Sequence, residues 1–137
     1  MNTRILIVED EELLAQALQL KLSKAGHTVS IAEDGEIALS KLEQDQKYDL
    51  MILDLAMPTT NGFTVLEKIK DADYRPADII VLSNLSSPED HERVTALGVP
   101  DNHILTKAKT PLSQIVSYVN DQIKISQDMS EPADIVD

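Results

Sequence analysis

Two hydrophobic patterns alternate along the chain. Short runs that are apolar at nearly every position are typical of strands covered on both faces of a parallel sheet. Stretches in which apolar residues recur every three or four positions are typical of amphipathic helices. The first pattern predicts five strands, over residues 5–8, 27–32, 50–53, 79–82 and 104–106.

A helix is expected after each strand. Helix-start and helix-stop residues flank the periodic stretches: Gly26 follows the first, Ser87-Pro88 precedes the fourth, which should end near Gly98, and Thr110-Pro111 precedes the last. The second helix should begin near Asp34. The residues expected to face the core are Leu14, Leu18, Leu22 and Ala25, then Ile37, Ala38 and Leu42, then Phe63, Leu66 and Ile69, and finally Leu112, Ile115, Val116, Val119 and Ile123.

Five strands alternating with five helices predict an α/β fold of the flavodoxin-like (βα)5 type. Right-handed crossovers give a doubly wound five-stranded parallel sheet in the order 2-1-3-4-5, with functional residues at the carboxyl ends of the strands. The chain has 137 residues, enough for one core. We expect a single domain over residues 1–125 and an acidic, disordered tail over residues 126–137.

The charge balance narrows the range of partners. The chain carries 24 acidic and 12 basic residues, a formal charge of −12. Such a surface repels phosphate backbones and anionic lipids, so we expect no direct nucleic-acid or membrane partner. The absence of cysteine, of a secretion signal and of any membrane-spanning apolar run predicts a cytoplasmic location.

Three carboxylates are predicted to meet at one edge of the sheet. Glu9 and Asp10 follow the first strand and Asp54 follows the third. Carboxylates this close need a proton or a cation, and hard oxygen ligands suit Mg²⁺. Asp54 also lies between apolar segments, where an unpaired charge is costly. Glu11 and Glu12 are better explained as solvated residues at the start of a helix.

Two further polar residues follow the remaining strands. Ser83 ends the fourth strand and Lys107 follows the fifth, at the same predicted edge. A hydroxyl and an ammonium can hold the oxygens of a transferring phosphoryl group, because that chemistry depends on positioning and charge neutralisation.

These motifs resemble the receiver domains of two-component response regulators. The resemblance runs from about Thr3 to Lys124. Its residues are Val8-Glu9-Asp10-Glu11, the segment Asp54-Leu55-Ala56-Met57-Pro58 with Gly62, Ser83 and Lys107.

The resemblance implies a single-domain response regulator that is not an enzyme. Asp54 would accept a phosphoryl group, with Mg²⁺ held by Glu9, Asp10, Asp54 and the backbone carbonyl of Ala56. Ser83 would bond a phosphoryl oxygen and Lys107 would pair with the acceptor. The donor would be a phosphohistidine on a sensor histidine kinase or histidine phosphotransfer protein. The output would be a protein target on the face formed by the fourth helix, fifth strand and fifth helix, or relay of the phosphoryl group.

The sequence differs from the family pattern at three positions. The pair Lys107-Ala108 stands where the family usually has Lys-Pro with a cis bond. Asn84 stands where alanine or glycine is usual. Ile104 replaces an aromatic residue, with His103 one place earlier. Ala56 and Leu85 offer no side-chain group to orient a hydrolytic water, so we expect a long-lived phosphorylated form.

Two other interpretations remain open. A degenerate receiver that acts as a constitutive docking module is motivated by Asn84, Ile104 and Ala108. A Mg²⁺-dependent phosphohydrolase is less favoured, because in a haloacid-dehalogenase-like enzyme a second aspartate would stand at the position of Ala56. His27, His91 and His103 lack metal-ligand spacing and are expected at the surface or at strand edges.

Overall fold

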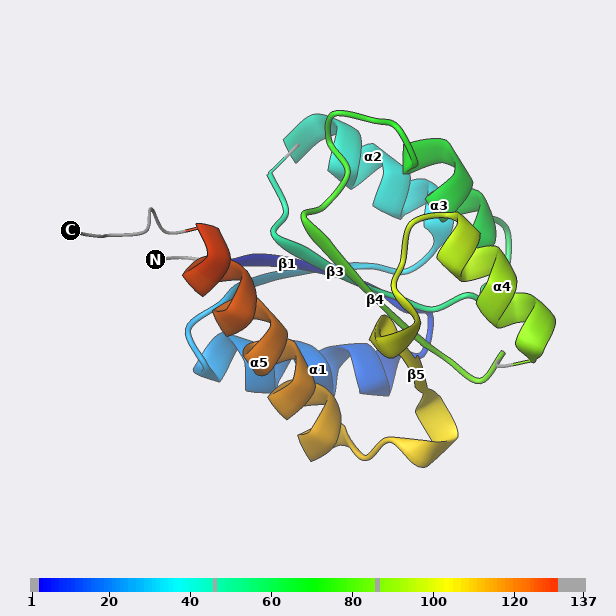
Figure 1. Cartoon of the computed structure of the whole chain (residues 1–137). Helices are drawn as coiled ribbons and strands as arrows, with labels where there is room; N and C mark the ends of the chain where they lie inside the picture. Colours follow the sequence, from blue (N-terminus) through cyan, green and yellow to red (C-terminus); the bar gives the residue numbers. More distant parts are fainter. Residues whose placement is uncertain (1–2, 46, 86, 131–137) are drawn as a thin grey trace.

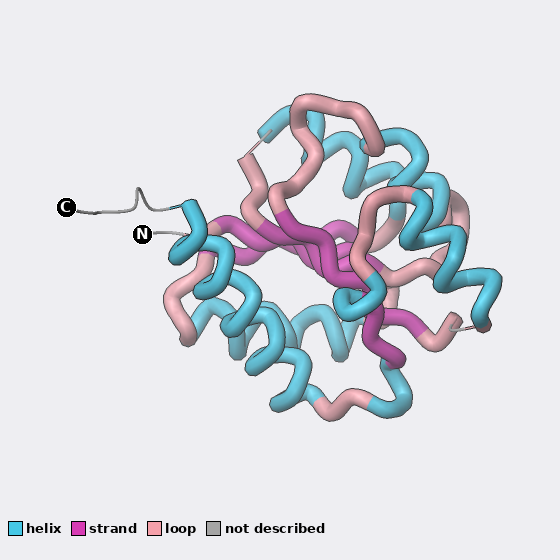
Figure 2. Tube along the Cα trace, viewed as in Figure 1, coloured by secondary structure: helices cyan, strands magenta, loops and turns pink. Residues whose placement is uncertain are grey.

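A parallel five-stranded sheet forms the centre of the molecule. The computed structural model describes residues 3–45, 47–85 and 87–130. The sheet order is β2-β1-β3-β4-β5, as predicted. Figures 1 and 2 show the strands at the centre with helices around them. The strands are β1 Arg4–Val8, β2 Thr28–Ala32, β3 Leu50–Leu53, β4 Asp78–Ser83 and β5 Ile104–Thr106.

Helices cover both faces of this sheet. In Figure 1, α2, α3 and α4 lie on one face, and α1 and α5 lie on the other. The helices are α1 Glu12–Lys24, α2 Gly35–Asp45, α3 Gly62–Ile69, α4 Pro88–Ala96 and α5 Leu112–Ser130. Two single turns of 3₁₀ helix flank β5, η1 Asp101–His103 and η2 Lys107–Lys109.

The apolar side chains of the strands contribute to two separate cores, one on each face of the sheet. Successive side chains of a strand point to opposite faces. Accordingly Leu6, Met51 and Val81 join the core beneath α2, α3 and α4. Ile5, Ile52 and Leu82 join the core beneath α1 and α5. Each strand therefore needs apolar residues at consecutive positions.

The predicted helix boundaries are confirmed at α1 and α4. Gly26 and Gly98 adopt φ values of 99° and 93° just after these helices, in the left-handed region that glycine tolerates. The Ser87 side chain accepts a hydrogen bond from the Asp90 N–H, and the Asp90 side chain bonds back to Ser87, with Pro88 in the first turn.

Four expectations differ from the structure. Ala25 was expected to face the core but is exposed, at the C-cap of α1. Ile37 is 39% exposed, because it lies about 100° around α2 from the buried Ala38. His103 is buried, with its ring held by backbone and side-chain partners. Helix α5 runs five residues past the predicted boundary at 125, and Gln127 of its last turns donates to the Thr3 hydroxyl.

The remainder of the predicted tail, residues 131–137, lies outside the described residues. Within the described part of the chain, no helix is both long enough and apolar enough to cross a membrane.

Candidate functional site

The three predicted carboxylates meet at the carboxyl edge of the sheet. Val8 pairs with Leu53 in neighbouring strands, so the residues that follow them lie side by side. One carboxylate oxygen from each of Glu9, Asp10 and Asp54 can be chosen so that all three lie within 4.8 Å of one another. Oxygen donors at this spacing fit a hard divalent cation such as Mg²⁺.

The Asp54 carboxylate is buried and held at both oxygens. Its residue is 3% exposed. The Ala56 N–H donates to Oδ1 over 3.1 Å, and Lys107 Nζ donates to Oδ2 over 3.1 Å. These two bonds fix the plane of the carboxylate before any ligand arrives.

Gly62 allows the first turn of α3 to lie against the backbone of Asp54. A Cβ at Gly62 would come within 2.4 Å of the Asp54 carbonyl oxygen and 2.8 Å of the Leu55 Cα. The Gly62 N–H also donates to the Leu55 carbonyl over 3.0 Å. The glycine in the sequence motif therefore has a steric reason.

Lys107 lies at the centre of the acidic cluster. Its Nζ donates to Glu9 over 3.0 Å and to Glu11 over 2.5 Å, in addition to its bond with Asp54. Burial by itself lowers the pKa of Lys107, but the hydrogen bonds with the three carboxylates outweigh burial and raise this pKa above its usual value. Lys107 therefore stays charged at any physiological pH.

Glu9 has an unusual protonation equilibrium. Its side chain is 3% exposed, and this burial raises the pKa of Glu9 to about 7, despite the hydrogen bonds from Lys107 and the Glu11 N–H. The free energy of ionising Glu9 is thus sensitive to whatever positive charge is nearby.

Ser83 lies at the same edge, at the end of β4. It is 1% exposed and pairs with Thr106 in the register of β4 and β5. Its Oγ accepts a hydrogen bond from the Leu85 N–H over 3.2 Å. Because a serine hydroxyl both accepts and donates, its proton remains available for an incoming oxygen.

Glu11 is a site residue that the sequence did not reveal. It precedes α1, but its side chain makes no capping hydrogen bond there and instead contacts Lys107. The sequence signal was present in the run Glu9-Asp10-Glu11, but solvated acids at a helix start look the same. Glu11 is 60% exposed at its side chain, so it lies at the rim of the cluster.

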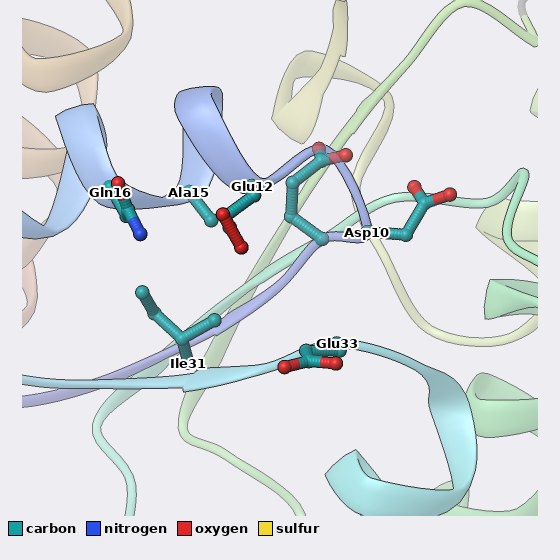
Figure 3. A pocket seen from close by; sticks show the side chains of 7 residues that line it. Asp10, Glu12, Ala15, Gln16, Ile31 and Glu33 are labelled. Carbon is teal, nitrogen blue, oxygen red and sulfur yellow. The ribbon is translucent and has the colours of Figure 1, made fainter.

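A pocket of about 280 Å³ opens beside the acidic cluster. Figure 3 shows it between the start of α1, which contributes Glu12, Ala15 and Gln16, and the end of β2, which contributes Ile31 with Glu33 just beyond. Glu9 and Asp10 complete its lining. The pocket therefore reaches two of the three carboxylate residues of the cluster.

A comparison with protein families assigns this fold and site to a class. The model of the response regulator receiver domain matches residues 5–120. The chain therefore belongs to the receiver domains of two-component systems. These are regulatory modules rather than enzymes, and they take phosphate from histidine kinases. The Glu9, Asp10 and Asp54 cluster is typical of the Mg²⁺ site of this family.

Individual relatives and solved structures agree with this assignment. The chain is 38% identical over 105 residues to response regulator ArlR of Staphylococcus epidermidis, covering 77% of this chain and 46% of that protein. It is 32% identical over 111 residues to the alkaline phosphatase synthesis transcriptional regulatory protein PhoP of Bacillus subtilis, covering 81% and 45% respectively. The chain thus spans about half the length of these relatives.

Solved receiver structures match nearly end to end. The receiver domain of a Francisella response regulator is 26% identical, with a TM-score of 0.78, covering 91% of this chain and 99% of that one. A response regulator receiver protein from Pseudomonas putida is 27% identical, with a TM-score of 0.77, covering 88% and 98%.

Proposed function

We propose that this protein accepts a phosphoryl group on Asp54 in a Mg²⁺-dependent reaction. The donor is a phosphohistidine of a sensor histidine kinase or a histidine phosphotransfer protein. The single observation that carries this proposal is the position of Asp54, whose carboxylate lies within the acidic cluster and is also bonded to Lys107. A buried carboxylate that is oriented and flanked by a cation site and an ammonium is suited to attack phosphorus.

The metal ligands proposed are Glu9, Asp10 and Asp54, together with the backbone carbonyl of Ala56. These residues would hold Mg²⁺, which would supply positive charge to the phosphoryl oxygens. The spacing of the three carboxylates supports this ligand set, as does the excess of negative charge over the single Lys107 ammonium.

In the transfer step an Asp54 oxygen forms a bond to phosphorus and the phosphorus–nitrogen bond to histidine breaks. The bonding electron pair stays with the imidazole, which takes up a proton, and Asp54 becomes an acyl phosphate. Lys107 exchanges its bond with the carboxylate for one with a phosphoryl oxygen, and the Ser83 hydroxyl donates to another.

The proposed output is a change in protein contacts on the face formed by α4, β5 and α5, or relay of the phosphoryl group. The pairing of Ser83 with Thr106 supports this face, because movement at Ser83 acts on the neighbouring strand β5. His103 does not substitute for an aromatic switch residue, since its ring nitrogens are engaged by the Ile79 carbonyl and the Gln122 side chain.

The test is phosphorylation of the protein itself. The protein is incubated with Mg²⁺ and acetyl phosphate or beryllofluoride, and intact mass and amide chemical shifts are followed beside an Asp54→Asn control. We expect a gain of one phosphoryl mass and shifts at Ser83 and Lys107, both absent in the control. No response at saturating reagent would favour the alternative of a degenerate receiver that acts by constitutive docking.

The lifetime of the acyl phosphate stays a separate prediction. Neither Ala56 nor Leu85 carries a group that orients water, so we expect the phosphorylated form to persist well beyond seconds. Loss of the label within seconds in Mg²⁺ buffer would contradict this.

A further inference from the structure

Two residues that flank the proposed phosphate-binding groups are joined by a hydrogen bond. Asn84 directly follows Ser83, and Ala108 directly follows Lys107. The Ala108 N–H donates to Asn84 Oδ1 over 2.8 Å. A backbone N–H can only donate, so the carbonyl oxygen of the Asn84 amide must be the atom that faces it.

This bond lies just beyond the point where the sheet ends. The register between β4 and β5 has Ser83 and Thr106 as its last pair. β5 has only three residues, and all of them are partly exposed. The hydrogen bond from Ala108 to Asn84 therefore connects the segments that follow β4 and β5, beyond the last pair of the sheet. Lys107 lies between Ala108 and that last pair.

The other hydrogen bonds to the backbone around Lys107 are local to its turn. The Thr110 N–H donates to the Lys107 carbonyl over 3.4 Å, and the Thr110 hydroxyl donates to the Thr106 carbonyl over 2.8 Å. These bonds hold η2 together but do not fix it relative to β4. The bond with Asn84 does so, because its two partners follow different strands.

We propose that Asn84 is a positioning residue that fixes the backbone of Lys107 relative to Ser83, through its bond with Ala108. The inference rests on the proposed function, in which the Lys107 ammonium and the Ser83 hydroxyl hold oxygens of the same phosphoryl group. It also explains together two residues that differ from the family pattern, Asn84 and Ala108, because they are the two partners of this hydrogen bond. A proline at position 108 has no N–H, so the bond with Asn84 requires a residue other than proline there.

The experiment compares the full chain with three variants. Asn84→Ala removes the acceptor. Asn84→Asp keeps an acceptor oxygen and serves as the conservative variant for amide exchange. Ala108→Ser changes the side chain of the partner but keeps its N–H, so it is the matched control. Each protein is measured for hydrogen exchange at the Ala108 amide, Mg²⁺ affinity, and beryllofluoride affinity in saturating Mg²⁺.

We expect Asn84→Ala to accelerate exchange at Ala108 and to weaken beryllofluoride binding by about two- to tenfold. Its Mg²⁺ affinity should stay unchanged, because the proposed metal ligands directly follow β1 and β3, away from the bond between Asn84 and Ala108. Slow exchange at Ala108 should persist in Asn84→Asp, and Ala108→Ser should match the wild type in all three measurements.

Three results would overturn the inference. They are unchanged exchange at Ala108 in Asn84→Ala, faster exchange with unchanged beryllofluoride affinity, and an equal loss of affinity in Ala108→Ser. A wild-type protein that does not respond to beryllofluoride at all would instead overturn the proposed function, and the positioning role with it. The two failures are therefore distinguishable.

Discussion

Lys107 shares one positive charge among three carboxylates. Glu9 and Asp54 are nearly fully buried, and the side chain of Lys107 is only 10% exposed. Glu11 and Asp10 add negative charge at the rim. One ammonium cannot balance this cluster, and the buried members cannot rely on water to screen them. A divalent cation or a bound proton supplies the remaining positive charge.

The pKa of Glu9 predicts how Mg²⁺ binding depends on pH. Because burial raises this pKa to about 7, Glu9 holds a proton below pH 7 and releases it when Mg²⁺ binds. We expect Mg²⁺ affinity to fall with acidification below about pH 7, by up to about tenfold per pH unit. Calorimetric titrations between pH 5.5 and 8 check this, and the Glu9→Gln variant should bind more weakly with a flatter pH dependence.

The same shift makes the metal-free protein less stable as pH rises. A folded-state pKa above the unfolded value means that protonated Glu9 stabilises the fold. That contribution is complete below about pH 4.5 and is lost as pH rises through about 7. Denaturant unfolding in the presence of a chelator should show this loss in the wild type. An identical pH profile in Glu9→Gln would assign it to another group.

Glu11 predicts a variant with faster phosphorylation. In the free protein Glu11 competes for the Lys107 ammonium that an incoming phosphoryl group needs. Glu11→Gln removes this competitor and one negative charge from the rim. We expect the rate of modification by acetyl phosphate to rise by about two- to fivefold at low salt, consistent with the modest energy of an exposed ion pair.

The matched control for Glu11 is Glu12→Gln, which removes the neighbouring charge on the first turn of α1. It should change the rate of phosphorylation less, since Glu12 lines the pocket and Lys107 pairs with Glu9, Glu11 and Asp54 instead. A slower reaction in Glu11→Gln would mean that Glu11 orients Lys107 rather than competing for it.

At the scale of elements, the close approach of α3 to the end of β3 places Asp54. Gly62→Ala puts a Cβ within 2.4 Å of the Asp54 carbonyl oxygen, and backbone on both sides limits relaxation. We expect a loss of about 1–3 kcal/mol in the free energy of unfolding, by analogy with overpacked cores. Beryllofluoride affinity should fall as well, because the displaced segment carries Asp54.

Gly26→Ala is the control for this prediction. Gly26 also has a conformational reason to be glycine, since its φ is 99°, but nothing lies within 4 Å of a Cβ placed there. Its replacement should cost about 1 kcal/mol from backbone strain alone. Beryllofluoride affinity should not change. If the two variants changed beryllofluoride affinity equally, Gly62 would have no specific role in positioning Asp54.

The elements and the site residues were predictable to different degrees. Continuous apolar runs such as residues 50–53 indicated buried parallel strands, and the cap at Ser87 gave the start of α4. Residues directly after strands could be placed at one edge because parallel strands share it. Three-dimensional partners were not predictable from local patterns. The burial of His103, and the contacts of Glu11 with Lys107 and of Asn84 with Ala108, join segments far apart in the sequence.

At the scale of the whole molecule, the net charge of −12 and the acidic cluster act together. Excess charge of one sign destabilises a compact fold by self-repulsion, and this effect concentrates where carboxylates converge. Binding of Mg²⁺ to the folded state alone stabilises it by an amount set by the ratio of ion concentration to dissociation constant. The acidic cluster therefore lowers the stability of the metal-free protein and makes its stability depend on Mg²⁺.

Asp10→Asn tests this relation. Asp10 is exposed at the rim, so removing its charge relieves repulsion without leaving a buried group unpaired. We expect the metal-free variant to be as stable as the wild type or more stable, by less than about 1 kcal/mol. At a Mg²⁺ concentration ten times its dissociation constant, the wild type should gain about 1.4 kcal/mol. The variant should gain little beyond the effect of sodium chloride at equal ionic strength.

The control is Asp73→Asn, on the connection between α3 and β4. It removes one charge at the opposite edge of the sheet and should keep the full Mg²⁺ response. Loss of that response in both variants would mean that net charge, rather than the Glu9, Asp10 and Asp54 cluster, governs the effect of Mg²⁺ on stability.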